Sequence, residues 1–217
     1  MIDLSNYRIV DLSYELVPGE RHINGEYLPG EPWYGRSLEL QEFFFSTARM
    51  HFLQAQTHLG THCEAPYKYQ DGPDVAGTDQ SSYLGEAVVC DFSAKAGGEA
   101  ITGADFAQAG VQRGDLVLVR TGKDLGDARP VMTVEAVDWL MGQEMRLLGS
   151  GGNVLYGPDL EGHLAAERRM LASGIPLIDG LYRLDQLRQN RVFFMALPLR
   201  IKRVSASWTR ASALEPQ

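Results

Sequence analysis

Three short apolar runs limit what this chain can fold into more than any other feature of its sequence. Each has the length of one strand and carries apolar residues at consecutive positions: EAVVCDF at 86–92, DLVLVRT at 115–121 and VFFMAL at 192–197. Strands of this kind are typically buried on both faces. Between them, 133–145 has the i, i+3, i+4 apolar spacing of an amphipathic helix, and 160–173 also has helical character. This mixture indicates an α/β or α+β fold, and we predict α/β, a mixed sheet with flanking helices.

The other segments give no sign of a second domain. No repeat, low-complexity segment or linker divides the 217 residues, so a single compact domain over 1–217 is expected. A loop rich in Gly, Pro and aromatic residues occupies 17–36, and the tail from Ser205 is expected to be weakly structured. Further β structure is expected at 8–13, 37–56, 146–149 and 175–178, and a short helix capped by Thr102 is expected to run to 109.

The composition excludes several classes of partner. Acidic residues outnumber basic ones by 28 to 20, and the net charge of −8 argues against nucleic acid or an anionic membrane. The longest apolar stretches are about six residues, against the roughly 20 that a membrane helix needs. Cys63 and Cys90 are the two cysteines and show no paired spacing, which fits a reducing cytoplasm. A phosphate-binding glycine loop is also absent from the sequence.

The segment that carries chemistry is THLGTHCEAPYK at 57–68. Gly60, Thr61 and Pro66 argue against a helix here, so a tight loop is expected to aim His58, His62 and Glu64 at one point. Two imidazoles and a carboxylate are a common ligand set for a catalytic divalent metal. The spacing alone is equally compatible with two surface or capping histidines beside an ordinary turn.

Several motifs resemble those of the cyclase-like metal-dependent amidohydrolase family, which includes bacterial kynurenine formamidase and isatin hydrolase. HLGTHCEAP resembles the family signature HxGTHxDxP. Further matching pieces follow the family order over nearly the whole chain: VDLS at 10–13, LPGEP at 28–32, MLASGIPLIDGLYRLDQL at 170–187, ALPL at 196–199 and SWTRA at 207–211. The resemblance implies a single domain of the kynurenine formamidase/cyclase-like type. It also implies a homodimer or a higher homo-oligomer.

The resemblance implies a set of metal ligands. His58, His62 and Glu64 occupy the positions of the metal-binding residues in the signature. Asp179 takes the position of a Glu that completes the site in two-metal members, and Glu167 takes the position of a His. His163 lies one helical turn before Glu167, so a shifted helix would offer it instead. A site this rich in carboxylates favours manganese or magnesium over the zinc also found in the family.

Lys68 is the largest departure from the family, because a histidine that serves as general acid/base usually stands there. Desolvation would lower the lysine pKa and make Lys68 a base. Alternatively, a charged Lys68 near Glu64 and Glu167 would replace a second metal. We predict one divalent ion per chain, manganese or zinc, and assign catalysis to His62, Glu64 and Lys68.

The predicted function is hydrolysis of a small amide, formamide, lactam or lactone by metal-activated water. Lys68, or a carboxylic acid of Glu64 or Glu167, would protonate the leaving group. Tyr27 and Trp33, in the early loop, are expected to contact the small-molecule substrate. Two alternatives stay open at this point. One is a related lyase, dehydratase or isomerase that uses Lys68 and Glu64 with one metal or none. The other is a non-catalytic small-molecule-binding protein.

Overall fold

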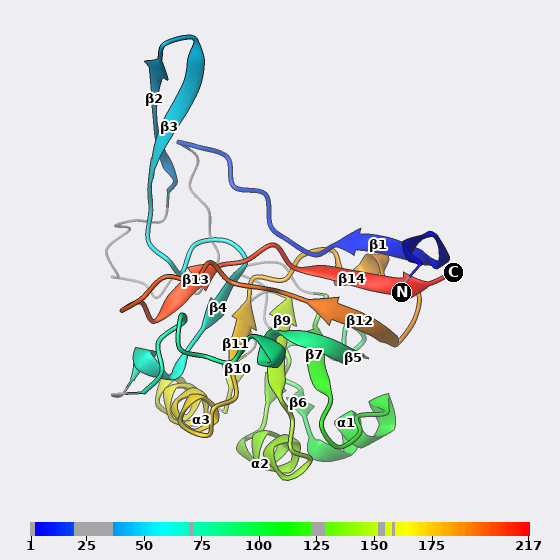
Figure 1. The fold of residues 1–217 in the computed structure, drawn as a ribbon. Coiled ribbons are helices and arrows are strands. Elements are labelled where there is room, and N and C mark those ends of the chain that lie inside the picture. Colours follow the sequence, from blue (N-terminus) through cyan, green and yellow to red (C-terminus); the bar gives the residue numbers. More distant parts are fainter. Residues whose placement is uncertain (1–2, 20–36, 70–71, 123–128, 152–154, 158) are drawn as a thin grey trace.

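The computed structural model describes residues 3–19, 37–69, 72–122, 129–151, 155–157 and 159–217 (Figure 1). Its main feature is a nine-stranded mixed sheet with the order β1-β14-β12-β5-β7-β9-β11-β4-β13. Neighbours among β5, β7, β9 and β11 run parallel, and the other neighbours run antiparallel. The predicted mixed sheet is therefore confirmed. The strands are β1 (Tyr7–Asp11), β4 (His62–Glu64), β5 (Leu84–Asp91), β7 (Leu116–Arg120), β9 (Leu147–Gly151), β11 (Leu177–Asp179), β12 (Arg191–Met195), β13 (Ala206–Trp208) and β14 (Ser212–Pro216).

Helices cover one face of this sheet (Figure 1). They are α1 (Gly103–Ala109), α2 (Val134–Gly142) and α3 (Leu160–Ala172), and the 3-10 helices are η1 (Leu4–Asn6), η2 (Pro66–Lys68), η3 (Gln80–Tyr83) and η4 (Leu184–Gln186). The predicted capping by Thr102 is confirmed, because its side chain accepts from the Asp105 backbone N–H in a capping box. A small sheet of β6 (Ala100–Ile101), β8 (Val131–Met132) and β10 (Leu155–Tyr156) completes this part of the fold.

Strand β7 shows why the apolar runs are continuous. Val117 and Val119 belong to the core cluster that contains the helix residues Phe106 and Leu140. The alternate residues of β7, Leu116 and Leu118, belong to a second cluster with Phe194 of β12. Successive side chains of a strand point to opposite faces, so a strand with a core on each side needs an apolar residue at every position.

The sheet curls so that its two ends approach each other. Strand β13 is the last in the sheet order and β14 is the second, yet only residues 209–211 separate them in the chain. A backbone hydrogen bond crosses between distant strands of the sheet order: the Tyr182 N–H, after β11, donates to the carbonyl of Leu12, after β1, over 2.9 Å. The expectation of a weakly structured tail from Ser205 is therefore wrong. Short strands of mixed polarity give little signal by themselves, and sheet partners far away in the sequence stabilise them.

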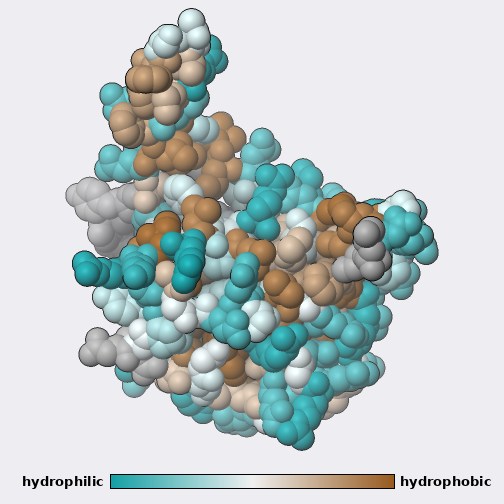
Figure 2. All heavy atoms as spheres, in the orientation of Figure 1, coloured by the Kyte–Doolittle hydropathy of each residue, from teal (hydrophilic) through white to brown (hydrophobic). Residues whose placement is uncertain are grey.

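The β structure expected within 37–56 consists of two strands, β2 (Glu39–Phe45) and β3 (Ala48–Gln54), which form an antiparallel hairpin. The hairpin extends away from the nine-stranded sheet (Figure 1). Its apolar side chains lie on the surface (Figure 2), and Phe44, Phe45 and Phe52 are 59%, 73% and 62% exposed.

Two further expectations bear on the class of protein. In the described parts of the chain, every helix falls short of the length and apolar character required to cross a bilayer. Cys63 and Cys90 are both buried and free of disulfide bonds.

Candidate metal site

Three side chains from one short segment converge near one end of the nine-stranded sheet, at its next-to-last strand β4. His58 lies in the turn before β4, and His62 and Glu64 are the first and third residues of β4, so their side chains share one face. One ligand atom from each of the three residues lies within 4.8 Å of the other two. We expected a tight loop to aim these groups; in fact β4 fixes two of them, held between β11 and β13.

The hydrogen bonds of His62 prepare it to bind a cation. Its Nδ1 lies 2.8 Å from the Gly60 carbonyl oxygen, which can only accept, so Nδ1 carries a proton and Nε2 is the ring nitrogen left to bind a cation. Nε2 lies 3.6 Å from Glu64 Oε1 and 4.0 Å from Asp179 Oδ2. Burial opposes a charge on His62, but the two carboxylates raise its pKa above the usual value. The surroundings of Nε2 therefore favour a positive charge.

His58 is more exposed than His62, at 31% of its side chain. Its Nδ1 lies 2.8 Å from Glu64 Oε1, and its Nε2 lies 3.3 Å from the Ser205 hydroxyl. Burial would raise the pKa of Glu64, but hydrogen bonds from His58 and His62 hold it well below the usual value, and the charge of Lys68 adds to this effect. Glu64 is thus a buried, ionised carboxylate facing two imidazoles. This donor set fits a divalent metal ion.

Lys68 joins Glu64 to helix α3. Its Nζ lies 2.9 and 2.8 Å from the two Glu64 oxygens and 2.5 Å from Glu167 Oε1. Burial opposes the charge of Lys68, but the two carboxylates raise its pKa above the usual value. The idea that desolvation turns Lys68 into a base is therefore wrong, because the partners that accompany burial outweigh it. The Tyr69 hydroxyl donates to the other oxygen of Glu167.

Glu167, and not the alternative His163, faces Lys68 and Glu64. Glu167 is 3% exposed and faces Lys68 and Glu64, whereas the His163 ring stacks on Tyr156 with centroids 5.0 Å apart. The His163 Nδ1 accepts from the Tyr156 backbone N–H over 3.3 Å. Burial raises the pKa of Glu167 to about 8, and the neighbouring Glu64 adds to the shift.

Asp179 stands opposite His62 in the register of β11 and β4. Its Oδ1 accepts from the Ser150 hydroxyl over 3.2 Å, and Ser150 belongs to the adjacent parallel strand β9. Burial, with the charge of Glu64 added, raises the pKa of Asp179. The site thus lies at the carboxyl ends of parallel strands, where α/β sheets generally bind ligands.

Tyr27 and Trp33, the expected substrate contacts, lie outside the described residues. A residue that our sequence reasoning did not single out is Trp208, which stands opposite His62 in the register of β13 and β4. Trp208 also lines a cavity of about 710 Å³ together with Thr61, Tyr14 and Tyr182. Its place within SWTRA, one of the matching motifs, was the signal that could have identified it.

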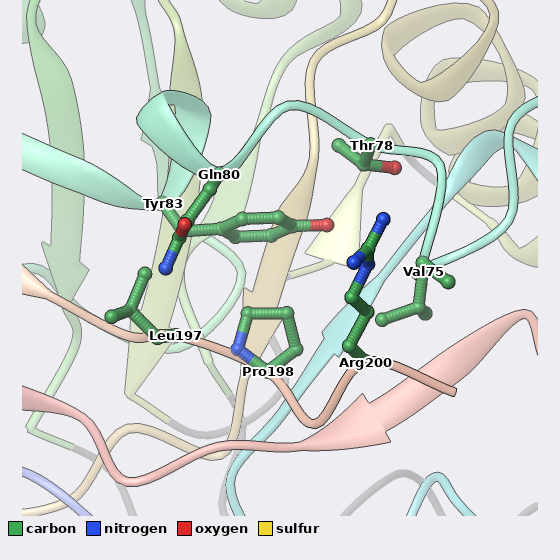
Figure 3. A pocket seen from close by; sticks show the side chains of 8 residues that line it. Val75, Thr78, Gln80, Tyr83, Leu197, Pro198 and Arg200 are labelled. Atoms are coloured by element: carbon green, nitrogen blue, oxygen red, sulfur yellow. The ribbon is translucent and has the colours of Figure 1, made fainter. Parts of the chain in front are cut away.

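A second cavity, of about 400 Å³, lies elsewhere and is lined by residues that include Tyr83, Thr78, Pro198 and Arg200 (Figure 3). None of the candidate metal ligands lines either cavity. The Thr78 hydroxyl already donates to the Asp74 carbonyl over 3.0 Å. The larger cavity is the one that includes Thr61, the residue before His62, and Trp208, which stands opposite His62 in the register of β13 and β4.

Comparison with known proteins decides the family. The family model described as "Putative cyclase" matches residues 10–151. The chain belongs to this cyclase family. The predicted resemblance is therefore confirmed. A further relative is the kynurenine formamidase of Erythrobacter litoralis (strain HTCC2594), which is 30% identical over 216 residues that cover 95% of this chain and 94% of that protein.

Solved structures agree with the cyclase fold. Isatin hydrolase A from Labrenzia aggregata, bound to benzyl benzoate, superposes with a TM-score of 0.83 at 23% identity, covering 98% of this chain and 95% of that one. The predicted metal-dependent hydrolase from Bacillus stearothermophilus gives a TM-score of 0.76 at 19% identity, covering 96% and 98%. At these identities the likeness concerns the fold alone.

Proposed function

We propose that this member of the cyclase family is a metal-dependent hydrolase that cleaves the C–N bond of a small amide, such as a formamide or a lactam; a lactone is the corresponding ester substrate. The observation that carries the proposal is the convergence of His58, His62 and Glu64, whose ligand atoms lie within 4.8 Å of one another. The names of the relatives, kynurenine formamidase and isatin hydrolase, support the same class of reaction.

A bound divalent ion supplies an activated water and polarises the carbonyl of the substrate. The protein's part is to hold the ligands in place. The Gly60 carbonyl fixes the His62 tautomer, and β11 and β13 hold the backbone of β4 from both sides. Glu64 supplies an ionised carboxylate between the two imidazoles.

The leaving nitrogen must gain a proton when the C–N bond breaks. We assign this transfer to the pair of Lys68 and Glu167, whose Nζ and Oε1 lie 2.5 Å apart. Lys68 stands where the family usually has its general acid/base histidine, and Glu167 keeps it charged and in place. The proton comes from the Glu167 carboxylic acid, whose pKa burial raises to about 8, and the Lys68 ammonium stabilises the carboxylate that remains.

The cavity beside β4 is the proposed substrate site. Trp208, Tyr14 and Tyr182 give it aromatic walls, which suit a small molecule with a flat apolar part. The Trp208 Nε1–H is buried and has no hydrogen-bond partner among the described residues, so the ring of Trp208, and not its N–H, is the part that lines the cavity.

We further propose one ion per chain, manganese or zinc, with the carboxylates of Glu167 and Asp179 beside the three nearest ligands. Oxygen ligands of this kind favour manganese. The free cysteines Cys63 and Cys90 support the proposed location in the reducing cytoplasm.

Metal content measured by mass spectrometry tests the site. The wild-type protein should carry about one manganese or zinc ion per chain, and His58→Ala and Glu64→Gln should both lose it. His51→Ala is the matched control, because His51 lies on the exposed hairpin and should leave the metal in place. Retention of the metal in both site variants, or its absence from the wild-type protein after supplementation, would overturn the proposal.

We also propose that the protein is a homodimer or a higher homo-oligomer whose contacts include the hairpin β2–β3. Within the described residues, these two strands pair only with each other, and an isolated two-stranded hairpin is marginally stable in water. Each buried aromatic ring covers roughly 150–250 Å². At their exposed fractions, Phe44, Phe45 and Phe52 offer roughly 300–500 Å². Leu40, Met50 and Leu53 add further apolar area toward the roughly 800 Å² per partner that a stable interface needs.

A second copy of the chain is the occupant to which we commit, since two arms related by a two-fold axis bury each other's apolar surface. Light scattering after size-exclusion chromatography should give a dimer or larger for the wild-type protein and a monomer for Phe44→Ser/Phe52→Ser. Ile9→Ser removes an equally exposed apolar residue from β1 and should leave the mass unchanged. A monomeric wild-type protein, or a variant with unchanged mass, contradicts this assignment.

A further inference from the structure

The Lys68 ammonium lies in a shell of carboxylate oxygens. Both oxygens of Glu64 and one oxygen of Glu167 lie 2.5 to 2.9 Å from Nζ. An ammonium group has three hydrogens, so these three contacts use all of its donors in the resting site. Carboxylate oxygens arranged around one point are also what a hard divalent cation binds.

We propose that Lys68 acts as a built-in cation that limits the site to one divalent ion, and that its removal opens a second ion site between Glu64 and Glu167. The inference rests on the proposed metal site and explains why that site holds one ion and not two.

The charges of the cluster support one ion. Glu64, Glu167 and Asp179 are the carboxylates that surround the site. One divalent ion and the Lys68 ammonium together carry three positive charges, as many as the three carboxyl groups balance when all of them are ionised. A second divalent ion would leave an excess of positive charge in a site where Glu64 and Glu167 are 2% and 3% exposed. Uncompensated charge is costly at such depth.

The geometry also shows what remains when Lys68 is removed. Glu64 Oε1 also faces His58 and His62, whereas the cation next to Oε2 is the Lys68 ammonium, so removing the ammonium takes the neighbouring positive charge away from Oε2. Glu167 Oε1 then faces the same space, and Tyr69 holds the other Glu167 oxygen. Two buried carboxylates without a cation between them repel each other, so the emptied position attracts a metal ion.

The test is the number of Mn²⁺ ions bound per chain after saturation and desalting, measured by mass spectrometry on the folded full chain. The wild-type protein should bind one ion and Lys68→Met two, because methionine keeps the side-chain volume and removes the charge. Lys68→Arg keeps the charge and should bind one. Lys95→Ala is the matched control, since Lys95 pairs with Glu99 and Asp105 outside the site, and it should also bind one.

A double variant locates the second ion. Adding Glu167→Gln to Lys68→Met should return the count from two ions to one. Lys68→Ala serves as the second charge-free variant, with circular dichroism as the check of folding.

The outcomes separate the two proposals. One ion in the wild-type protein and one in both charge-free variants overturns the role of Lys68 and leaves the metal site intact. Two ions in the wild-type protein also overturn the role of Lys68 alone. Absence of metal from every variant and from the wild-type protein overturns the metal site and this inference together.

Discussion

Replacement of Gly60 by alanine tests whether the turn before β4 orients the metal ligands. Gly60 has a φ of +68°, a region that L-residues with a side chain enter at a cost of about 1–2 kcal/mol. A Cβ at this position would also lie 2.9 Å from Leu16 Cδ2. Leu16 Cδ2 is the end of a flexible, half-buried side chain, so displacing it adds up to about 1 kcal/mol. Gly60→Ala should therefore destabilise the fold by about 1–3 kcal/mol.

Gly98→Ala is the matched control, because Gly98 has a similar φ of +77° and nothing within 4 Å of its added Cβ. It should lose only the backbone part, about 1–2 kcal/mol. In a chain of this size, each kcal/mol lowers Tm by roughly 2–4 °C, so thermal unfolding should separate the two variants. The melting temperature of Gly60→Ala should fall further, by up to about 4 °C more.

Metal affinity gives the decisive readout. The Gly60 carbonyl accepts from His62 Nδ1 over 2.8 Å, and partners of this kind typically contribute about 10–100-fold to metal affinity. A titration with Mn²⁺ should show this loss for Gly60→Ala and no change for Gly98→Ala. If folded Gly60→Ala bound Mn²⁺ as tightly as the control, the argument that the conformation of this turn orients the metal ligands would be wrong.

Three further predictions concern the same region. Burial raises the pKa of Glu167 to about 8 from a usual value of 4.5, so between these pH values the folded metal-free protein holds a proton that the unfolded chain has released. The free energy of unfolding should therefore fall as the pH rises from 4.5 to about 8. Denaturant titrations should show a smaller fall for Glu167→Gln. Chelation should lower Tm by about 5–10 °C relative to protein with metal at 100 times Kd, a difference of about 2.7 kcal/mol, whereas an unchanged Tm would speak against a bound metal. Trp208→Phe should raise KM about tenfold with little change in kcat, and Tyr83→Phe, in the smaller cavity, should change neither constant. If both variants changed KM equally, the larger cavity would not be the substrate site.

The parts of the fold that could be predicted are those whose signal is local. The apolar run 115–121 predicts β7 because both of its faces are buried, and the amphipathic spacing in 133–145 predicts α2. The capping box at Thr102 is likewise complete within four residues. These elements required no knowledge of their partners in space.

The elements that were missed depend on distant partners. Strand β4 has three residues, too few to show a period, and it exists because β11 and β13 pair with it. The C-terminal strands follow the same rule, since β14 pairs with β1 at the other end of the chain. Both pairings of β4, and the pairing of β14 with β1, join segments more than 100 residues apart.

The candidate site also has one part that the local sequence predicts and another that depends on distant partners. His58, His62 and Glu64 lie within seven residues, so their grouping could be read from the sequence. The contact between Lys68 and Glu167 spans 99 positions and came from the resemblance to the family. Nothing in the local sequence indicates that burial beside two carboxylates keeps Lys68 charged, because that balance depends on how η2 packs against α3.

Metal-dependent turnover tests the central claim most directly. The protein is stripped with a chelator and assayed for release of product from formanilides, lactams and isatin-like rings, before and after Mn²⁺ or Zn²⁺ is restored. We predict that hydrolysis of at least one of these amides stops on stripping and returns with metal in the wild-type protein, but not in Glu64→Gln. Hydrolysis that continues without metal, or that Glu64→Gln carries out at the wild-type rate, would contradict the account.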